Sequence, residues 1–355
     1  MIKILFILAN LSEGGAQHMI YDLIKYLDKS KFEPFLLCYS GKTSSALEQK
    51  VEEICAVQYM YEKGHIGFSS IWRVWKQINS YKPDLIHAHL GGMIYAIPWV
   101  FFQKGRKLIV TAHTTPKMAF NKKVEPLLKY LLKVRKNDTR VVAVSKENHA
   151  MLCSYLGVSK DVCACVNNGV DLDKFYTKEH AKFTYINVAR QDDNKNQDAI
   201  LEAFHEVHAL YLDTQLLLIG DGPCHHKLVD RVKKLGLETS VLLPGMVGDV
   251  ENYYAISDVY VQASHREALP LSALEAMAAG LPLLSTNVGG MKDIVKGNGV
   301  LIPDHDEIAL QSEMIAMYTA SPERKKTMKN ISLVLIQEYS SKKWRKNIQV
   351  YILKS

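Results

Sequence analysis

The stretch that decides the fold covers residues 265–282 and reads HREALPLSALEAMAAGLP. A turn holding Glu267 and Pro270 is followed by good helix formers up to Gly280, which stands where a helix C-cap belongs. Apolar runs of strand length flank the segment at 258–262 and 283–286. Strand, turn, helix and strand in this order predict an α/β domain with a parallel sheet.

This segment also offers groups for an anionic ligand. The first turn of the predicted helix would present unpaired backbone N–H groups from about Ala268 to Ser272, including Leu269, a natural site for a diphosphate. Glu275 follows Glu267 by roughly two helical turns and could reach a second group, such as a ribose diol. The alternative is a surface helix with two solvated carboxylates.

The chain begins with another strand, turn and helix. The apolar run 2–8 leads into Gly14 and Gly15 and then an amphipathic segment, as Rossmann-like domains do. A Gly-x-Gly-x-x-Gly fingerprint is missing, and no acidic residue ends the next predicted strand, 35–39. A nicotinamide-dependent dehydrogenase is therefore disfavoured.

Strands and helices continue to alternate through the first half, which predicts a doubly wound parallel sheet. Ligands of such sheets bind beyond the carboxyl ends of the strands. His89 and His113 each follow a predicted strand there. A single histidine in this place is more often structural than functional. No third ligand has a spacing that suits zinc.

The second half opens with a strand at 183–189 and a polar loop that holds Arg190 and Lys195. Two basic residues near a strand end and a helix start form a clamp suited to a diphosphate. Their alternative is two solvated side chains. A glycine turn at Gly220 and a strand at 241–243 follow, and the predicted helix 341–352 comes last.

Length and composition narrow the class of protein. A chain of 355 residues predicts two domains, and 48% hydrophobic with 23% charged residues is an ordinary globular balance. The six cysteines include no Cys-x-x-Cys pair and are interpreted as buried thiols of a cytosolic protein. The first ten residues lack the pattern of a signal peptide, so we expect a soluble or peripheral protein.

Positive charge is concentrated in one segment, Phe101–Ala150. It holds twelve Lys or Arg against three acidic residues, a net +9, whereas the rest of the chain carries −2. Such a cluster suggests an anionic partner (a phospholipid surface, a lipid diphosphate or nucleic acid) or else a solvated helix face. The run Lys122–Lys136 can form an amphipathic helix that binds an anionic membrane.

Several of these motifs occur together in one known family. The pair Glu267 and Glu275 forms a Glu-x7-Glu motif with the continuation EAMAAGLP, residues 168–175 read NGVDLDKF, and Arg190 and Lys195 occupy one loop. In these motifs the chain resembles the retaining glycosyltransferases of family 4, of the bacterial polysaccharide type. It departs from them at Ala268-Leu269, where Gly-Phe is common, and at Ala189 and Asn196, where glycines flank the basic loop.

The resemblance implies the two-domain GT-B fold and a reaction. The expected domains are an acceptor-binding Rossmann-like domain (1–170), a nucleotide-sugar-binding one (171–340) and a C-terminal helix (341–355) that packs back on the first. The expected reaction moves a sugar, with retention, from a nucleotide-diphosphate-sugar such as a UDP-sugar to a saccharide or polyprenyl-diphosphate-linked acceptor. Its setting would be capsule or exopolysaccharide synthesis, in the cytoplasm or on the inner face of the membrane.

Roles follow from the family for particular residues. Catalytic roles fall to Glu267, His113, Arg190 and Lys195, and the resemblance implies a functional role for His89 less strongly than for His113. The donor would be bound by Gly14, Gly15, Arg190, Lys195, Gly220, Met246, Val247, Ala268, Leu269 and Glu275. The Asp171-x-Asp173 sequence is interpreted as part of the interdomain junction and not as a metal site, and neither a metal, another cofactor nor nucleic acid is expected. The rival functions are a nucleotide-sugar epimerase, an inverting transferase and a non-catalytic nucleotide-sugar-binding subunit.

Overall fold

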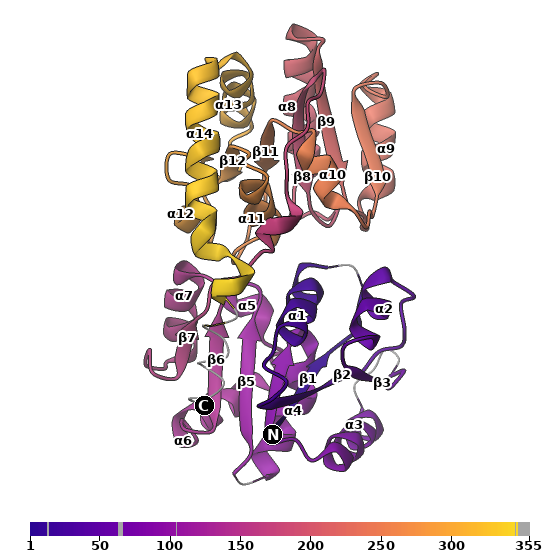
Figure 1. Ribbon diagram of the computed structural model, residues 1–355, viewed down its shortest axis with the longest axis vertical. Helices are drawn as coiled ribbons and strands as arrows, with labels where there is room; N and C mark the ends of the chain where they lie inside the picture. The colour runs from indigo at the N-terminus through magenta and orange to yellow at the C-terminus, as the bar shows by residue number, and fades with distance from the viewer. Residues whose placement is uncertain (13, 63–66, 104, 345, 347–355) are drawn as a thin grey trace. The chain divides into compact units, whose positions relative to one another are not determined.

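The protein divides into two compact units, each built around its own sheet (Figure 1). The structure, a computed structural model, describes residues 1–355 except 13, 63–66, 104, 345 and 347–355. Unit 1 comprises residues 1–168 and 343–355, and unit 2 comprises residues 169–342. The sequence placed its boundaries after residues 170 and 340.

Unit 1 contains a seven-stranded sheet with the order β3-β2-β1-β4-β5-β6-β7. Its strands are β1 (Ile2–Leu8), β2 (Phe32–Cys38), β3 (Ala56–Tyr59), β4 (Leu85–His89), β5 (Lys107–Ala112), β6 (Thr139–Ala143) and β7 (Cys163–Cys165). Its helices are α1 (Gly15–Lys25), α2 (Ala46–Glu52), α3 (Phe68–Tyr81), α4 (Met93–Phe102), α5 (Pro116–Ala119), α6 (Glu125–Val134) and α7 (Lys146–Leu156), with a 3-10 turn η1 (Leu90–Gly92).

The sheet of unit 1 is parallel and covered on both faces. Helices α3, α4, α6 and α7 contribute Val74, Trp99, Leu128 and other side chains to the core on one face. On the other face Met19 and Leu23 of α1 lie around a small cavity with side chains of β4, β5 and β6. Continuous apolar strands such as β1 are the sequence pattern of a sheet buried on both sides.

Unit 2 contains a six-stranded parallel sheet with the order β10-β9-β8-β11-β12-β13. Its strands are β8 (Phe183–Val188), β9 (Thr214–Ile219), β10 (Val241–Gly245), β11 (Val259–Gln262), β12 (Leu283–Thr286) and β13 (Gly299–Ile302). Its helices are α8 (Gln197–Leu210), α9 (His225–Lys234), α10 (Val250–Ala255), α11 (Leu271–Ala278), α12 (Met291–Ile294), α13 (Glu307–Thr319) and α14 (Pro322–Leu335), with 3-10 turns η2 (Leu172–Lys174) and η3 (Ile336–Tyr339).

The core of unit 2 lies between the sheet and two long helices. Phe204 of α8 and Met314 of α13 pack on the strands together with Tyr185 of β8. The Tyr185 hydroxyl donates a hydrogen bond of 2.7 Å to the backbone oxygen of Met314, so the buried phenol keeps a polar partner. Two doubly wound parallel sheets confirm the predicted α/β class.

Two predicted helices differ in the structure. The expected helix Lys122–Lys136 is shorter, because the backbone oxygen of Asn121 accepts from the N–H groups of Val124 and Glu125 and α6 begins only at Glu125. Pro126 fits its first turn, where a proline needs no N–H donor. Most of the expected helix 341–352 lies outside the described residues, but Trp344 is buried in unit 1 and lines the small cavity beside α1.

Two further observations concern exposure. Cys38, Cys55 and Cys163 are buried, but Cys153 and Cys224 are partly exposed and Cys165 is exposed, so the prediction of buried thiols holds for half of the cysteines. Among the described residues, none of the helices combines the length and the apolarity needed to cross a membrane.

Candidate active site

In unit 2 the predicted catalytic residues follow two adjacent strands. The sheet runs outward in opposite directions from β8 and β11, which lie side by side at its middle. Such a switch in strand order leaves an opening beyond the carboxyl ends of the strands, where α/β proteins bind ligands. Arg190 and Lys195 come just after β8, and Glu267 comes just after β11. The sheet topology thus brings these two loops together.

Lys195 and Glu267 form an ion pair that joins these loops. The Lys195 Nζ lies 2.5 Å from Oε1 of Glu267, and their side chains are 22% and 10% exposed. Backbone contacts hold the pair in place, since Asn194 accepts a hydrogen bond of 2.9 Å from the His265 N–H. The Asn194 side-chain amide also donates to the Arg266 oxygen at 3.0 Å. These two contacts of Asn194 hold the loop that carries Lys195 against the loop that carries Glu267.

The loop after β8 also explains one departure from the family motif. Asn196, which stands in place of a glycine, adopts a left-handed conformation with φ 50° and ψ 44° as the N-cap of α8. Asparagine tolerates this region better than other non-glycine residues, so the loop keeps its shape. The Arg190 Nε lies 3.7 Å from the Asp192 carboxylate, but its side chain is 71% exposed, so a ligand can reach the guanidinium.

Gly289 supports Glu267 from the loop after β12. A Cβ atom at Gly289 would lie 1.9 Å from the Glu267 backbone oxygen, and its φ of 49° is left-handed. The next residue, Gly290, donates its N–H to the Ala268 oxygen at 2.7 Å. Only glycine fits this close approach of two backbones. The contact of Gly289 with Glu267 joins residues that are 22 positions apart along the chain, so the sequence alone does not reveal it.

The helix after Glu267 begins later than the sequence predicted. Helix α11 starts at Leu271 with Pro270 as its N-cap, so Ala268 and Leu269 precede the helix and are buried. The N–H groups without an acceptor inside the helix are therefore those of the turn that begins at Leu271. The helix ends as predicted at Gly280, whose N–H donates to the Met277 oxygen in a Schellman-type cap.

Glu275 lies on α11 within a network of hydroxyl groups. The Tyr254 hydroxyl is 2.9 Å from the Ser272 backbone oxygen and 3.2 Å from Oε2 of Glu275. Burial, with the nearby Glu275 carboxylate, raises the pKa of Tyr254 well above its usual value. The hydroxyl therefore stays protonated and donates, which fixes the position of Glu275. Tyr254 had no signal in the sequence, because its partner lies 21 residues further along the chain.

The remaining predicted donor residues of unit 2 follow its outer strands. Gly220 directly follows β9 and has a φ of 124°. A Cβ atom on Gly220 would lie 2.1 Å from the backbone oxygen of Ala189, so only glycine fits there. Its N–H donates to the Gly245 oxygen at 2.9 Å, so the turns after β9 and β10 are joined. Met246, half exposed, and Val247, partly buried, come directly after β10. They lie at the same sheet edge as Arg190.

In unit 1 the predicted glycines follow β1, His89 is the last residue of β4 and not beyond it as predicted, and His113 follows β5. Strands β1 and β4 are neighbours where the strand order of this sheet reverses. Gly14 is the N-cap of α1, Gly15 is its first residue, and Gly14 is extended with φ −154°. An extended backbone suits any residue, so the conformation of Gly14 does not require glycine. What the glycines provide is room beside the start of α1, because they have no side chain.

Three histidines meet at the same edge of unit 1. The Nδ1 of His89 lies 3.0 Å from Nε2 of His113, and Nε2 of His87 lies 2.8 Å from the Thr111 hydroxyl oxygen. Burial lowers the pKa of His113 to about 4 and that of His87 to about 3. At neutral pH both rings are neutral, so His113 can orient a ligand by hydrogen bonds but carries no positive charge to share. His87 lies on β4 with His89 and contacts Thr111 on the neighbouring strand β5. The sequence analysis did not single it out.

Comparison with known proteins agrees with this arrangement. A family model described as Glycosyltransferase Family 4 matches residues 13–174, and one described as Glycosyl transferases group 1 matches residues 171–333. An uncharacterised glycosyltransferase of Methanocaldococcus jannaschii is 24% identical over 61% of this chain and 58% of its own length. The Escherichia coli UDP-Gal:alpha-D-GlcNAc-diphosphoundecaprenol alpha-1,3-galactosyltransferase is 25% identical over 82% of each chain.

A solved structure agrees over the whole length. HepE of Anabaena in complex with UDP and glucose superposes with a TM-score of 0.83, is 19% identical and covers 100% of both chains. At this identity the likeness speaks for the fold, which is that of the GT-B glycosyltransferases. The two family models together span residues 13–333, one for each Rossmann-like half. The chain therefore belongs to the family-4 type of GT-B glycosyltransferases.

Proposed function

We propose that this glycosyltransferase moves a sugar, with retention of anomeric configuration, from a UDP-sugar to a saccharide or lipid-linked acceptor of a cell-surface polysaccharide. The observation that carries the proposal is the Lys195–Glu267 pair at the strand-order switch of unit 2. The complex of HepE with UDP and glucose supports the donor class. The diphosphoundecaprenol substrate in the name of the E. coli relative supports a lipid-linked acceptor.

The residues of unit 2 suit a reaction in which the leaving diphosphate helps to deprotonate the acceptor. Arg190 and Lys195 stabilise the negative charge that grows on the leaving group, and the first turn of α11 adds backbone N–H groups. Glu267 then positions the sugar through its hydroxyl groups. Because cationic side chains and a helix N-terminus meet the diphosphate, the proposed reaction needs no metal ion.

The test begins with the donor. We would measure thermal stabilisation of the purified chain by a panel of nucleotide-sugars, since a ligand at 100 times its dissociation constant adds roughly 2.7 kcal/mol of apparent stability. The best donor should then release UDP when an acceptor is added, and NMR should show that the product keeps the anomeric configuration of the donor. An inverted product would refute retention, interconversion of sugars without transfer would indicate an epimerase, and binding without UDP release a non-catalytic subunit.

We further propose that unit 1 docks on the anionic inner face of the cell membrane. The structure changes the expected means of docking, because Leu128, Leu131 and Leu132 of α6 are buried in the core and unavailable to lipid. Exposed aromatic rings lie beside them instead. The Phe101 ring is 5.1 Å from that of Phe102 and 5.9 Å from that of Tyr130.

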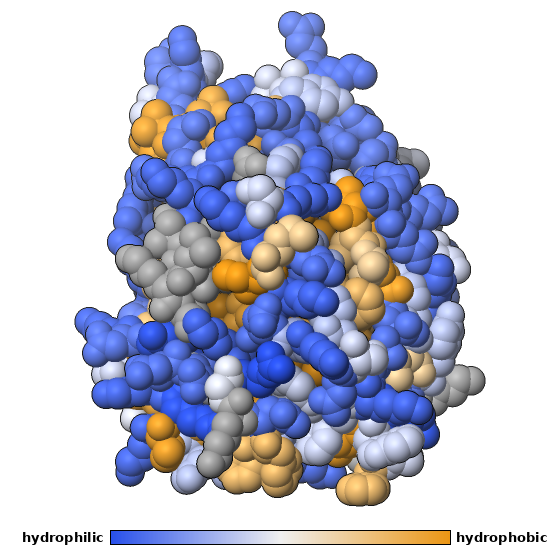
Figure 2. Space-filling model, turned by 60° about the horizontal axis from the view of Figure 1, so that its bottom comes forward, coloured by the Kyte–Doolittle hydropathy of each residue, from blue (hydrophilic) through white to orange (hydrophobic). Residues whose placement is uncertain are grey.

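Exposed basic side chains belong to the same segment as the aromatic cluster of Phe101, Phe102 and Tyr130. Lys122, Lys123 and Lys133 are exposed on or just before α6. Figure 2 shows a face of the molecule on which patches of hydrophobic residues lie among hydrophilic ones. Exposed aromatic rings with neighbouring lysines suit a surface of anionic lipid headgroups, where each cation contributes on the order of 1 kcal/mol.

Vesicle co-sedimentation tests the docking proposal. The protein should bind anionic but not zwitterionic vesicles, and binding should weaken as salt rises. Changing Lys122, Lys123 and Lys133 to Glu should abolish binding, whereas the matched change of Lys227, Lys233 and Lys234 to Glu in α9 should leave it intact. If the wild-type protein ignores anionic vesicles at low salt, a soluble acceptor becomes the better proposal.

A further inference from the structure

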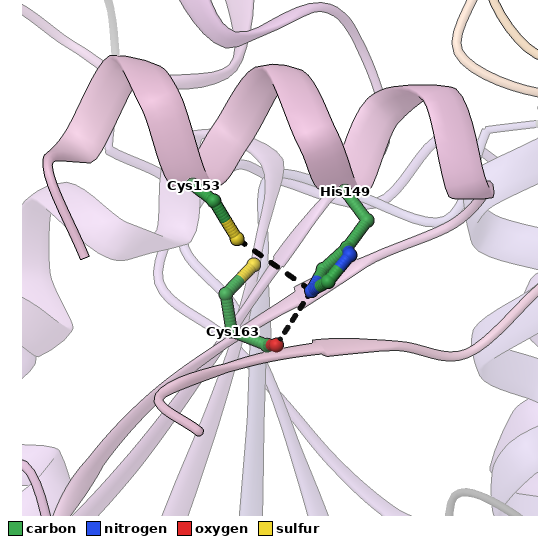
Figure 3. A group of neighbouring side chains, drawn as sticks. All are labelled: His149, Cys153 and Cys163. Atoms are coloured by element: carbon green, nitrogen blue, oxygen red, sulfur yellow. Dashed lines mark hydrogen bonds between the residues drawn. The ribbon is translucent and has the colours of Figure 1, made fainter. Parts of the chain in front are cut away.

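A group of metal-ligating side chains lies in unit 1, apart from the strand-order switch. His149 and Cys153 are four residues apart on α7, and Cys163 begins the edge strand β7. Figure 3 shows both helix side chains pointing toward Cys163. The Cys153 Sγ is 3.6 Å from Nε2 of His149, and the ligand atoms of all three residues lie within 4.8 Å of one another.

These distances suit one tetrahedral metal ion. Zinc binds thiolate sulfur at roughly 2.3 Å and imidazole nitrogen at roughly 2.0–2.1 Å, so tetrahedral S and N ligands lie about 3.5 Å apart. The 3.6 Å between Cys153 and His149 is already the separation of two such ligands. Two sulfurs and one imidazole favour zinc over magnesium or calcium, which prefer oxygen.

We propose that Nε2 of His149 and the Sγ atoms of Cys153 and Cys163 bind one zinc ion, which fastens α7 to the edge strand β7. Cys163 is buried, whereas His149 and Cys153 are partly exposed, so the ion can enter from the solvent side and keep a water as its fourth ligand. The ion would tie α7 to β7 and take no part in sugar transfer, although most structural zinc sites fill the fourth position, here held by water, with a protein ligand. It would clamp a strand of only three residues that has a neighbour on one side.

Zinc binding would replace a hydrogen bond of His149 by a bond to the metal. In the metal-free protein Nε2 of His149 donates a hydrogen bond of 2.8 Å to the Cys163 backbone oxygen. A nitrogen that binds metal carries no proton, so this hydrogen bond is replaced by the bond to zinc and the neutral ring holds its proton on Nδ1. Both thiols release their protons, because thiolates are the ligands.

This site has no recognisable signature in the sequence. The cluster combines a His and a Cys at positions i and i+4, which share one face of a helix, with a Cys ten residues further on a strand. It therefore has none of the Cys-x-x-Cys spacing by which zinc sites are recognised.

Metal binding to the full chain tests the proposal. The protein would be treated with a chelator and a reductant, and zinc would be titrated against a chromogenic competitor. We expect about one tightly bound zinc per chain and a higher melting temperature with zinc. Cobalt used in its place should give a tetrahedral spectrum with thiolate charge-transfer bands. His149→Gln and Cys153→Ser, both at partly exposed positions, should each lower the affinity by at least roughly 10–100-fold.

Two controls separate this cluster from other sites. Cys224→Ser removes a partly exposed cysteine of unit 2, and His265→Gln disrupts the group of His265, Asp304 and His305, which offers no sulfur. Both variants should bind zinc as the wild type does. The proposal is overturned if the reduced wild type takes up no zinc, if cobalt binds without charge-transfer bands, or if uptake survives both ligand variants. Recovery of a Cys153–Cys163 disulfide without zinc uptake after reduction would overturn it as well.

Discussion

The two units carry different chemistry at equivalent positions of their sheets. Where the strand order of unit 2 reverses, the loops hold a lysine and a glutamate joined at 2.5 Å and an exposed arginine. Where the strand order of unit 1 reverses, burial holds three histidines in the neutral state. Unit 2 is thus equipped to stabilise charge and unit 1 to accept and donate neutral hydrogen bonds. One fold therefore provides two electrostatic environments.

The largest effect is expected from removing a charge in unit 2. Lys195→Ala deletes the cation that we propose to stabilise the leaving group, and loss of one preorganised interaction of this kind costs roughly 10²–10³-fold in turnover. Arg190→Ala should fall in the same range. Both would be measured as UDP release, with circular dichroism to show that the variants fold.

Lys234→Ala on α9 provides the control, because it removes a lysine of the same unit that lies on a helix away from the loops after β8 and β11. It should keep normal turnover. If folded Lys195→Ala and Arg190→Ala do so too, unit 2 does not act through charge and the contrast between the units fails.

The second largest effect is expected from a substitution that displaces Glu267 without changing any charge. Gly289→Ala would place a Cβ atom 1.9 Å from the Glu267 oxygen and impose a left-handed φ of 49° on alanine. We expect a loss of about 1–3 kcal/mol in stability from the strain and the overpacking. Turnover should fall up to about 10²-fold, since a catalytic group would be displaced.

Gly248→Ala is the matched control for this substitution. A Cβ atom there meets no heavy atom within 4 Å. Its melting temperature and turnover should equal those of the wild type. Normal activity of Gly289→Ala would show that the position of Glu267 is not critical.

The neutral histidines of unit 1 predict a pH dependence of stability. Burial lowers the pKa of His87 from 6.5 to about 3, so on acidification the unfolded chain takes up a proton that the folded chain refuses. The free energy of unfolding should therefore decrease as pH falls below about 6.5, by about 1.4 kcal/mol per pH unit for this residue. At pH 5 the loss from His87 is about 2 kcal/mol.

Tryptophan fluorescence can follow this loss in unit 1 alone, because Trp72, Trp75, Trp99 and Trp344 all belong to that unit. Urea unfolding between pH 7 and pH 5 should show a shallower pH dependence for His87→Gln than for the wild type. The exposed His226→Gln in unit 2 should leave it unchanged. An equal slope in His87→Gln would mean that its ring is charged or solvated in the folded protein.

The fold could be predicted from the sequence because its signals are local. Apolar runs, glycine turns and capped helices report on neighbours within a few residues, and they gave the parallel sheets of both units and the Gly280 helix end. The helix limits were less accurate. Pro270 at the N-cap moved the start of α11 beyond Leu269, and the turn at Asn121 shortened α6.

The site could be predicted only as far as motifs reach. Glu267, Glu275, Arg190 and Lys195 were chosen because they match family motifs, and their roles stay predictions, although their loops follow the adjacent strands β8 and β11. What the sequence missed are contacts between distant segments: Gly289 against Glu267, Tyr254 beneath Glu275, and His87 against Thr111 of the neighbouring strand. These contacts depend on how the chain folds in three dimensions, so the types of the residues alone do not reveal them.

The smallest effect is expected at Glu275. It would separate a charged residue that binds the donor from those that stabilise the transition state. Its carboxylate is fixed by the Tyr254 hydroxyl at 3.2 Å on the second turn of α11. We expect it to bind the ribose equally in the ground state and the transition state, so Glu275→Gln should raise the KM for the donor several-fold with kcat nearly unchanged. Tyr254→Phe should raise KM less, because it loosens the carboxylate without removing it. A drop in kcat as large as that of Lys195→Ala would instead place Glu275 among the groups that act on the transition state, and an unchanged KM in both variants would mean that the carboxylate is merely solvated.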